Sequence, residues 1–180
     1  CCLAFIRMNK MNVSAAWIYD EEGRRYESEE GELFFGLSEI DGEFYYFDEQ
    51  GYMQTGKIYV EAEDAYYYAN EEGIIQFGVI DTEDHFYLTD TNGRLKTGFV
   101  DYDGRLYYFN ANADYMAGWF KLDDDWYYAE HRGELATGLV TIDGYRYYFD
   151  ENGVRAGDAV IELEGVTYII LSDGSVDENA

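Results

Sequence analysis

Residues 138–157 read GLVTIDGYRYYFDENGVRAG, and most of the chain is written in this pattern. The stretch 36–56, GLSEIDGEFYYFDEQGYMQTG, has the same opening glycine, the same IDG and the same YYFDE. Similar glycines recur at spacings of 20, 22, 20, 20, 20 and 19 residues, at Gly36, Gly56, Gly78, Gly98, Gly118, Gly138 and Gly157. Self-similarity at a short fixed period is the signature of a repeat architecture. We therefore expect about eight copies of one motif of about 20 residues.

Each copy predicts a β-hairpin. In 36–56, a short run with apolar ends precedes Asp41-Gly42, and such a pair favours a type I′ turn, in which both residues need positive φ. The following EFYYF predicts the return strand, since Phe and Tyr favour strands. Equivalent turn pairs are Asp103-Gly104, Asp143-Gly144 and Glu164-Gly165.

The hairpins are expected to stack. An isolated two-stranded hairpin is only marginally stable in water, so each hairpin must pack on its neighbour. Aromatic residues make up 19% of the chain, with 20 Tyr and 11 Phe, and would fill these contacts. An apolar position after each aromatic strand, here called the tail position, is also expected to be buried; it holds Leu33, Met53, Ile75, Leu95, Tyr115 and Leu135.

The predicted fold is all-β, a solenoid of about eight stacked hairpins. Residues 1–15 would form an N-terminal tail or cap. Residues 16–157 would form seven hairpin repeats, and 158–180 a terminal repeat and C-terminal tail.

Net charge narrows the class of ligand. The chain has 38 acidic residues, 12 Lys and Arg, and a formal charge of −26. Duplex DNA and RNA require a basic patch that follows the phosphates, and no Lys or Arg cluster is present in the sequence. We expect no nucleic-acid partner and no membrane insertion, because no apolar run approaches the roughly 18 residues of a spanning helix. Neutral or cationic ligands are favoured.

Two thiols stand at the N-terminus, Cys1 and Cys2. Neighbouring cysteines rarely form a disulfide, and the repeats offer no cysteine-rich zinc site. A lipid anchor on Cys1 is one interpretation; the favoured one is that residues 1–16 are a loosely packed cap or a remnant outside the repeats. The apolar part is too short, and its basic residues are on the wrong side, for an intact signal peptide.

The order of Gly-aromatic, Asp-Gly, aromatic-Tyr-Tyr-Phe and Gly-x-hydrophobic-x-Thr-Gly resembles the cell-wall-binding repeat superfamily, over about residues 16–176. That group includes choline-binding modules of Gram-positive surface proteins, glucan-binding repeats and the C-terminal repeats of large clostridial toxins. The resemblance implies a hairpin solenoid that is secreted or attached to the cell surface. It implies partners such as a cell-wall glycan or choline-bearing polymer, with a host glycan or protein as further candidates.

In the choline-binding branch, the resemblance implies a cage of three rings that attract a quaternary ammonium. The first ring follows the opening glycine, the second begins the aromatic strand, and the third is a Tyr of the next repeat. The full set occurs once, as Trp119, Trp126 and Tyr147. Trp17 restores the first position in the earliest unit, with Arg24 and Arg25 where the second ring would be.

Other units replace the cage rings. Their first position holds Leu37, Lys57, Val79, Phe99, Leu139 or Asp158, and their second position Phe44, Tyr66, Phe86, Leu106, Arg146 or Thr167. Stretches such as TIDGYRYYFDENG are closer to the toxin and glucan-binding repeats, for which the resemblance implies carbohydrate. Aromatic faces stack on the apolar face of a pyranose, and carboxylates accept its hydroxyl protons.

Neither a cofactor nor a catalytic site is expected. The acidic runs at 90–93, 101–104 and 123–125 could bind calcium, although turn formation explains them better. His85 and His131 lie in different repeats, and neither has a neighbouring Ser or Cys in a nucleophile motif. A hairpin solenoid without long insertions lacks a deep pocket.

Three interpretations of function stay open. The favoured one is a non-catalytic module that binds cell-wall or surface carbohydrate polymer. The others are a structural spacer or protein-binding array, and a choline-binding anchor with one surviving cage. For Tyr46, Tyr108, Tyr128 and Tyr148, packing of hairpins is the favoured role; Trp119 and Trp126 differ from the Leu and Phe found at equivalent positions.

Overall fold

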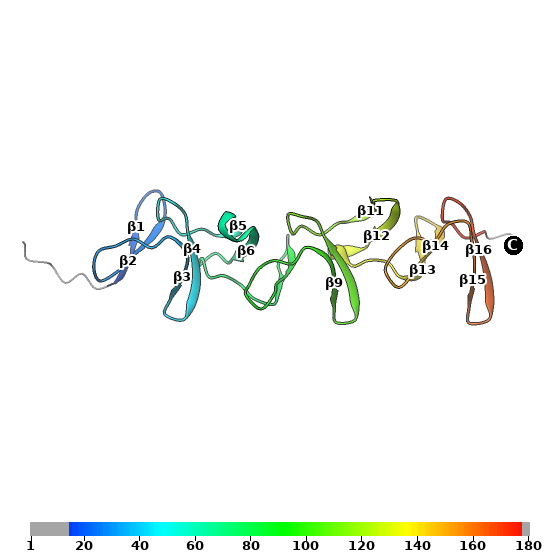
Figure 1. Ribbon diagram of the computed structural model, residues 1–180, viewed down its shortest axis with the longest axis horizontal. Helices are drawn as coiled ribbons and strands as arrows, with labels where there is room; N and C mark the ends of the chain where they lie inside the picture. The colour runs from blue at the N-terminus through cyan, green and yellow to red at the C-terminus, as the bar shows by residue number, and fades with distance from the viewer. Residues whose placement is uncertain (1–14, 178–180) are drawn as a thin grey trace, which may run out of the picture. The chain divides into compact units, whose positions relative to one another are not determined.

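The computed structural model describes residues 15–177, and the strands in this range form eight antiparallel two-stranded hairpins (Figure 1). The first four are β1 (Ala16–Tyr19) with β2 (Arg24–Glu27), β3 (Gly36–Ile40) with β4 (Glu43–Phe47), β5 (Gly56–Val60) with β6 (Ala65–Ala69), and β7 (Val79–Asp81) with β8 (Phe86–Leu88). The last four are β9 (Gly98–Tyr102) with β10 (Arg105–Phe109), β11 (Gly118–Leu122) with β12 (Asp125–Ala129), β13 (Gly138–Ile142) with β14 (Tyr145–Phe149), and β15 (Ala159–Leu163) with β16 (Val166–Ile170). The all-β hairpin fold is confirmed.

The predicted turn chemistry is confirmed, because both residues of each predicted turn pair have positive φ. Asp41 and Gly42 have φ of 54° and 87°, and Asp143 and Gly144 have φ of 50° and 87°. Two short 3₁₀ turns were not predicted, η1 (Glu61–Glu63) and η2 (His131–Gly133). The first lies in the unit between Gly56 and Gly78, where the glycine spacing is 22. The extra residues of that unit therefore lengthen the turn of its hairpin.

Successive hairpins are joined by a recurring backbone bond. After its second strand the chain turns back, and the tail residue donates its N–H to a carbonyl within the first two residues of the aromatic strand of the preceding hairpin. Met53 N donates a hydrogen bond to Arg24 O at 2.7 Å, Ile75 N to Phe44 O at 2.8 Å, and Arg155 N to Trp126 O at 2.8 Å. Each such bond fixes the aromatic strand of one repeat against the next.

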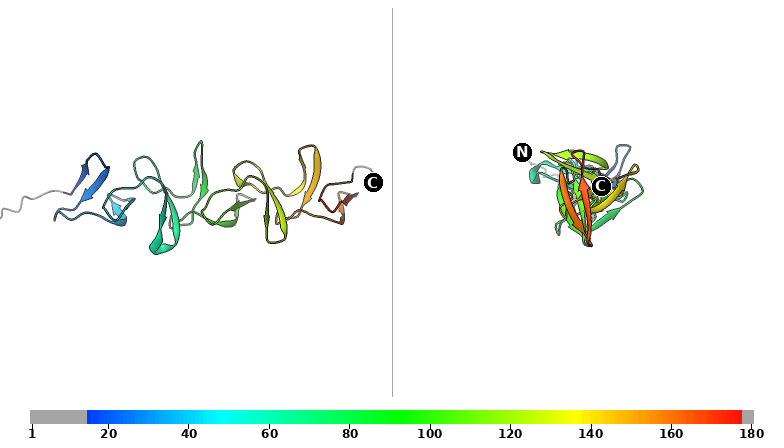
Figure 2. Two further views of the ribbon diagram at one scale, coloured as in Figure 1. Left: turned by 90° about the horizontal axis from the view of Figure 1, so that it is seen from above. Right: turned by 90° about the vertical axis from the view of Figure 1, so that its right-hand side faces the viewer.

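The described residues form two compact units. One extends to Phe77 and includes Thr91–Arg94; the other comprises Gly78–Asp90 and the residues from Leu95 onward. Within each unit, successive hairpins project in different directions (Figure 2). Burial is divided among small clusters at hairpin contacts, such as Ile40, Phe47 and Met53, or Ala136, Ile142 and Phe149. This is the distributed core that a repeat array requires.

Two expectations need correction. Among the tail residues, Leu33 and Tyr115 are only half-buried, because the clusters close mainly around the last residue of each aromatic strand, such as Phe47 and Phe109. In the terminal repeat the first ring position is Val160 and not Asp158, because Ala159 pairs with Ile170 as Gly138 pairs with Phe149.

Some features lie beyond what the structure describes. Cys1, Cys2 and all but residue 15 of the expected cap lie outside the described residues. Among the described residues, no helix is long and apolar enough to cross a membrane.

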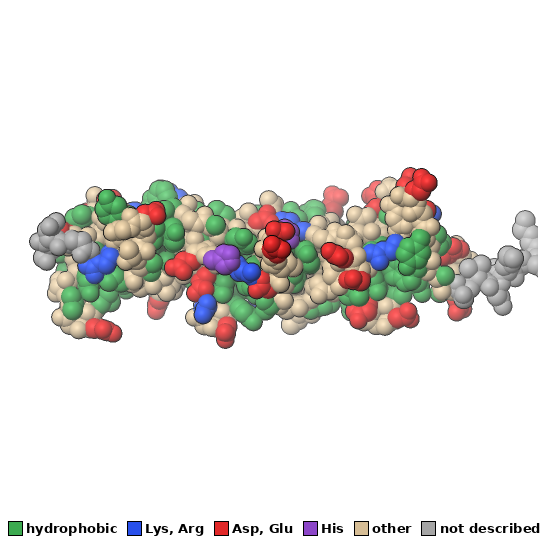
Figure 3. All heavy atoms as spheres, turned by 180° about the vertical axis from the view of Figure 1, so that it is seen from behind, with side chains coloured by type: hydrophobic (Ala, Val, Ile, Leu, Met, Phe, Trp, Pro, Cys, Tyr) green, Lys and Arg blue, Asp and Glu red, His purple; other side chains and the backbone are tan. Residues whose placement is uncertain are grey.

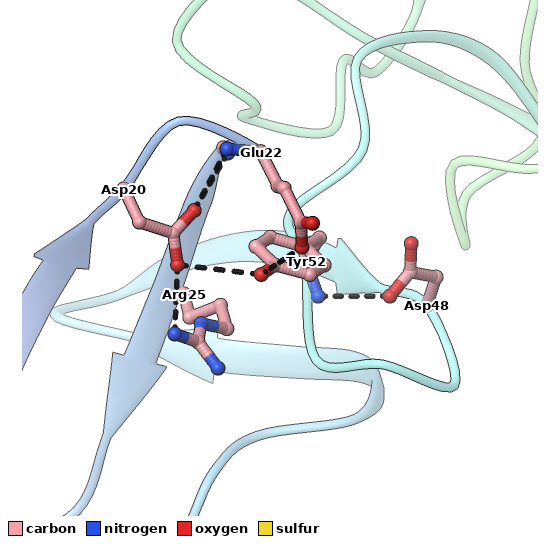
Figure 4. Close-up of polar contacts among 6 residues, drawn as sticks. Asp20, Glu22, Arg25, Asp48 and Tyr52 are labelled. Atoms are coloured by element: carbon pink, nitrogen blue, oxygen red, sulfur yellow. Dashed lines mark hydrogen bonds and ion pairs between the residues drawn. The ribbon is translucent and has the colours of Figure 1, made fainter.

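A polar cluster connects the first two hairpins of the first unit (Figure 4). The Tyr52 hydroxyl donates to Glu22 at 2.7 Å and to Asp20 at 3.3 Å. Arg25 donates to the same Asp20 carboxylate at 2.7 Å, and its guanidinium carbon lies 5.0 Å from the Tyr52 ring centroid. The hydrogen bond to Glu22, with burial and the charge of Asp20, raises the pKa of Tyr52 from 10.0 to about 12.

This cluster predicts a loss of stability at high pH. The neutral hydroxyl is favoured in the folded state, so its contribution is fully present below about pH 10 and is lost as the pH rises through about 12. Urea unfolding from pH 9 to 12 should show the free-energy advantage of the wild type over Tyr52→Phe shrinking across this range. An advantage that stays constant to pH 12 would mean that Tyr52 ionises equally in both states.

Candidate functional site

The three predicted cage residues come together in the second unit, and we call them the Trp119 site. Trp119 lies on β11, Trp126 on β12 and Tyr147 on β14 of the next hairpin. The Trp119 ring centroid is 6.5 Å from that of Trp126 and 4.9 Å from that of Tyr147, with both pairs edge to face. Trp126 is 39% exposed, whereas Trp119 and Tyr147 are half-buried. The site is therefore an aromatic corner with one ring open to solvent.

Packing fixes the orientation of the Trp119 ring. Its centroid is 5.1 Å from that of Tyr128 and 5.8 Å from that of the fully buried Phe149. On the other side of the site, the carbonyl of Trp126 accepts the N–H of Arg155, so that the strand carrying the second ring is held by the backbone of the following repeat. The site is thus pre-formed, and two successive hairpins are needed to make it.

A cation already lies at the Trp119 site. The guanidinium carbon of Arg155 is 5.9 Å from the Trp126 ring centroid, and the same side chain donates to the backbone carbonyl of Asp173. Sequence reasoning missed this residue. The available signal was that Arg155 occupies the tail position, where the equivalent residues of the other repeats are apolar or aromatic.

The earliest repeat of the first unit reproduces most of this geometry. Trp17 lies 5.1 Å from Tyr45 and 6.0 Å from Phe47, as Trp119 lies from Tyr147 and Phe149. The strand register places Arg24 at the second ring position, where the other site has Trp126. Arg24 donates to the carbonyl of Glu71 at 2.7 Å. The structure therefore brings Trp17 and Tyr45 together and places Arg24 at the position of the second ring, and a partial site at Trp17 stays a prediction.

Other repeats contain related substitutions. The Lys57 ammonium lies 5.4 Å from the Tyr66 ring centroid, and the Arg146 guanidinium 5.4 Å from that of Tyr168. Phe99 keeps an aromatic first position, 5.4 Å from Tyr127. The same arrangement of ring positions thus recurs in several repeats, with different side chains at those positions.

Acidic side chains are dispersed over the surface. Figure 3 shows Asp and Glu side chains scattered across one face, with hydrophobic side chains between them. A surface of this composition repels polyanions and admits neutral or cationic groups. Within residues 15–177, no group of three or more His, Cys, Asp or Glu side chains is arranged to hold a metal ion. His131 accepts a hydrogen bond from Arg132 at 3.0 Å, and His85 stacks beside Tyr87.

The comparisons with known proteins agree with these repeats. Residues 35–75 match the family described as choline-binding repeat. Residues 97–112, 117–130 and 137–154 match the family described as putative cell wall binding repeat. The Trp119 site lies within the last two of these segments. No curated protein sequence matches the chain.

Solved structures share the fold. Choline binding protein F from Streptococcus pneumoniae has a TM-score of 0.73 and 24% identity, covering 92% of this chain and 58% of that one. CbpJ from Streptococcus pneumoniae has a TM-score of 0.72 and 26% identity, covering 91% of this chain and 58% of that one. The modular autolysin LytC from the same species has a TM-score of 0.53 and 22% identity, covering 91% and 39%. This chain thus spans 58% of the length of the first two structures.

Proposed function

Because its repeats belong to the cell-wall-binding repeat superfamily, we propose that this chain is a non-catalytic module that attaches to a choline-bearing or carbohydrate polymer of a bacterial cell wall. The observation that carries the proposal is the Trp119 site, where three rings from two successive hairpins converge and Trp126 remains open to solvent. The module would act outside the cell, secreted or held at the surface of a Gram-positive bacterium.

The recognition step follows from the chemistry of the rings. A quaternary ammonium cannot donate a strong hydrogen bond and is attracted to the electron-rich faces of Trp and Tyr. Each ring contributes about 0.5 to 2 kcal/mol, which after the cost of association leaves a dissociation constant on the order of millimolar. Useful attachment then depends on many ligands along one polymer, because linked binding events raise the effective concentration.

The test is a choline titration of the chain, followed by tryptophan fluorescence. We expect a saturable change that Trp126→Ala weakens by about 2- to 30-fold, the loss of one ring. Trp126 is the exposed member of the site, so its replacement should leave the fold intact. Trp17→Phe is the matched control, since the second position beside Trp17 is already Arg24.

Binding to the natural polymer requires a second arm. Isolated Gram-positive cell walls should retain the chain at physiological salt, and excess choline or soluble glycan should release it. If walls, choline and glycans all fail to bind, the proposal is wrong, and the repeats act as a spacer or bind a protein.

A further inference from the structure

A second site lies in the first unit, in a hollow that we call the Phe44 hollow. It has a volume of about 540 Å³, which is within the range of roughly 300–1,000 Å³ typical of small-ligand sites. It occupies the same place in the repeat as the Trp119 site. Leu37, Phe44 and Tyr67 stand at the first, second and third ring positions, as the registers of β3–β6 and β11–β14 show.

The hollow is built by the same backbone bond as the Trp119 site. Ile75 N donates to Phe44 O at 2.8 Å, as Arg155 N donates to Trp126 O. The lining differs in chemistry, however. Leu37 replaces a Trp at the first position, and an apolar Ile75 replaces Arg155 at the tail. With one aromatic cage wall lost, the hollow does not provide the three-ring cage that a quaternary ammonium requires.

One side of the hollow is an exposed aromatic surface. Phe44 and Phe77 are 41% and 48% exposed, and their ring centroids lie 6.0 Å apart at an interplanar angle of 62°. Gly93 allows this arrangement, because a Cβ at that position would lie 2.9 Å from the Phe77 ring. Two large apolar rings kept at the surface beside a cavity indicate a binding surface for a partly apolar ligand.

The other side of the hollow is polar and pre-organised. Arg94 Nε donates to Glu63 at 3.0 Å, and the Tyr67 hydroxyl donates to the same carboxylate at 2.8 Å. Asn92 lines the hollow beside them. Glu63 is the last residue of η1, so the lengthened turn of this repeat supplies the carboxylate. Glu63 Oε2 thus accepts three donors, Nε and Nη2 of Arg94 and the Tyr67 hydroxyl, and the two oxygens of a carboxylate offer about four acceptor positions in all.

We propose that the Phe44 hollow binds a neutral pyranose unit of a polysaccharide chain. The apolar face of the sugar would stack on Phe44 or Phe77, and its hydroxyls would bond to Glu63, Arg94 and Asn92. An anionic sugar is disfavoured, since Glu39 and Glu63 line the hollow against the single charge of Arg94. This inference rests on the proposed function in its carbohydrate form, and adds to it a location and a class of sugar.

The test is calorimetric titration of the full chain with three neutral probes: maltoheptaose, isomaltoheptaose and chitohexaose. At least one should bind, and Phe77→Ala should weaken it by about 3- to 10-fold through the lost stacking. Glu63→Gln, which keeps the shape of the side chain, should weaken it by about 10-fold through the lost charged acceptor. Phe35→Ala is the matched control, because Phe35 precedes Gly36 as Phe77 precedes Gly78, is 55% exposed and lies outside the hollow.

The two sites can be separated in the same experiment. No Trp lines the hollow, so a bound sugar should leave the tryptophan signal unchanged, and saturating choline should leave the affinity for sugar unchanged. If the chain bound choline or cell walls but none of the neutral probes, the proposed sugar site in the Phe44 hollow would be wrong, and the proposed function would stand. Sugar binding that is unchanged in both Phe77→Ala and Glu63→Gln would also contradict a sugar site in the hollow. Failure of every ligand, walls included, would overturn the proposed function as well.

Discussion

Phe149→Ala should destabilise the second unit by about 3–5 kcal/mol and weaken choline binding at the Trp119 site. The Phe149 side chain is 0% exposed, and its ring lies 5.8 Å from that of Trp119. Its removal leaves a cavity directly beneath the first ring, so both packing and ligand geometry are lost. Urea unfolding in a Trp17→Phe background would measure the stability, because the two remaining tryptophans both lie in the second unit.

Phe47→Ala is the control for this prediction. Phe47 is also 0% exposed and lies 6.0 Å from Trp17, so the same atoms are removed from the equivalent position in the first unit. We expect a comparable loss of stability in that unit and an unchanged affinity for choline. If Phe149→Ala lowered stability and left choline affinity intact, Phe149 would have no part in positioning Trp119.

Arg155→Met should increase the affinity for choline by about 3- to 10-fold at physiological salt. The Arg155 guanidinium carbon lies 5.9 Å from the Trp126 ring centroid, where it repels a second cation on the same ring. Two unit charges about 6 Å apart repel by roughly 0.7 kcal/mol in water and more when partly buried, and salt screens this effect. Methionine suits the position, because Met53 occupies it in the first unit.

A salt series and a neighbouring variant test the cause. The gain from Arg155→Met should shrink as ionic strength rises, if charge is responsible. Arg146→Met removes the same charge from the Tyr168 ring in the next repeat and should leave the choline affinity unchanged. Weaker binding by Arg155→Met would show that the guanidinium is instead part of the ligand site, holding an anionic group beside the ammonium.

Much of the fold could be predicted from the sequence, because the same turn and strand pattern recurs in successive repeats. A type I′ turn needs positive φ at both central residues, and Asp41-Gly42 adopts it. Such pairs recurring at a fixed period predict a series of hairpins. Trp119, Trp126 and Tyr147 were predicted from the resemblance to the choline-binding branch, which implies a ring at three fixed positions of the repeat. Local chemistry sufficed here because the contacts are made between neighbours in the chain.

The rest depended on where side chains extend between repeats. Arg155 reaches Trp126, and Arg94 reaches Glu63, across separations that the hairpin pattern does not specify. The irregular spacing of 22 residues did mark the repeat that carries η1. Spacing alone could not show that its extra turn points a carboxylate into a hollow. Asp158 was misplaced for a similar reason, because the terminal repeat shifts its register after Gly157.

The backbone bond from a tail residue to the preceding aromatic strand also bears on how such an array changes over generations. Because a site needs rings from two successive hairpins, duplication or loss of a single period alters the length and the number of binding sites in the same event. Excising residues 118–137 would leave an intact period on either side and bring Leu106 against the repeat of Tyr147. Recombination between repeats would thus create a new site between two hairpins, lined by a new combination of side chains, without any amino-acid substitution.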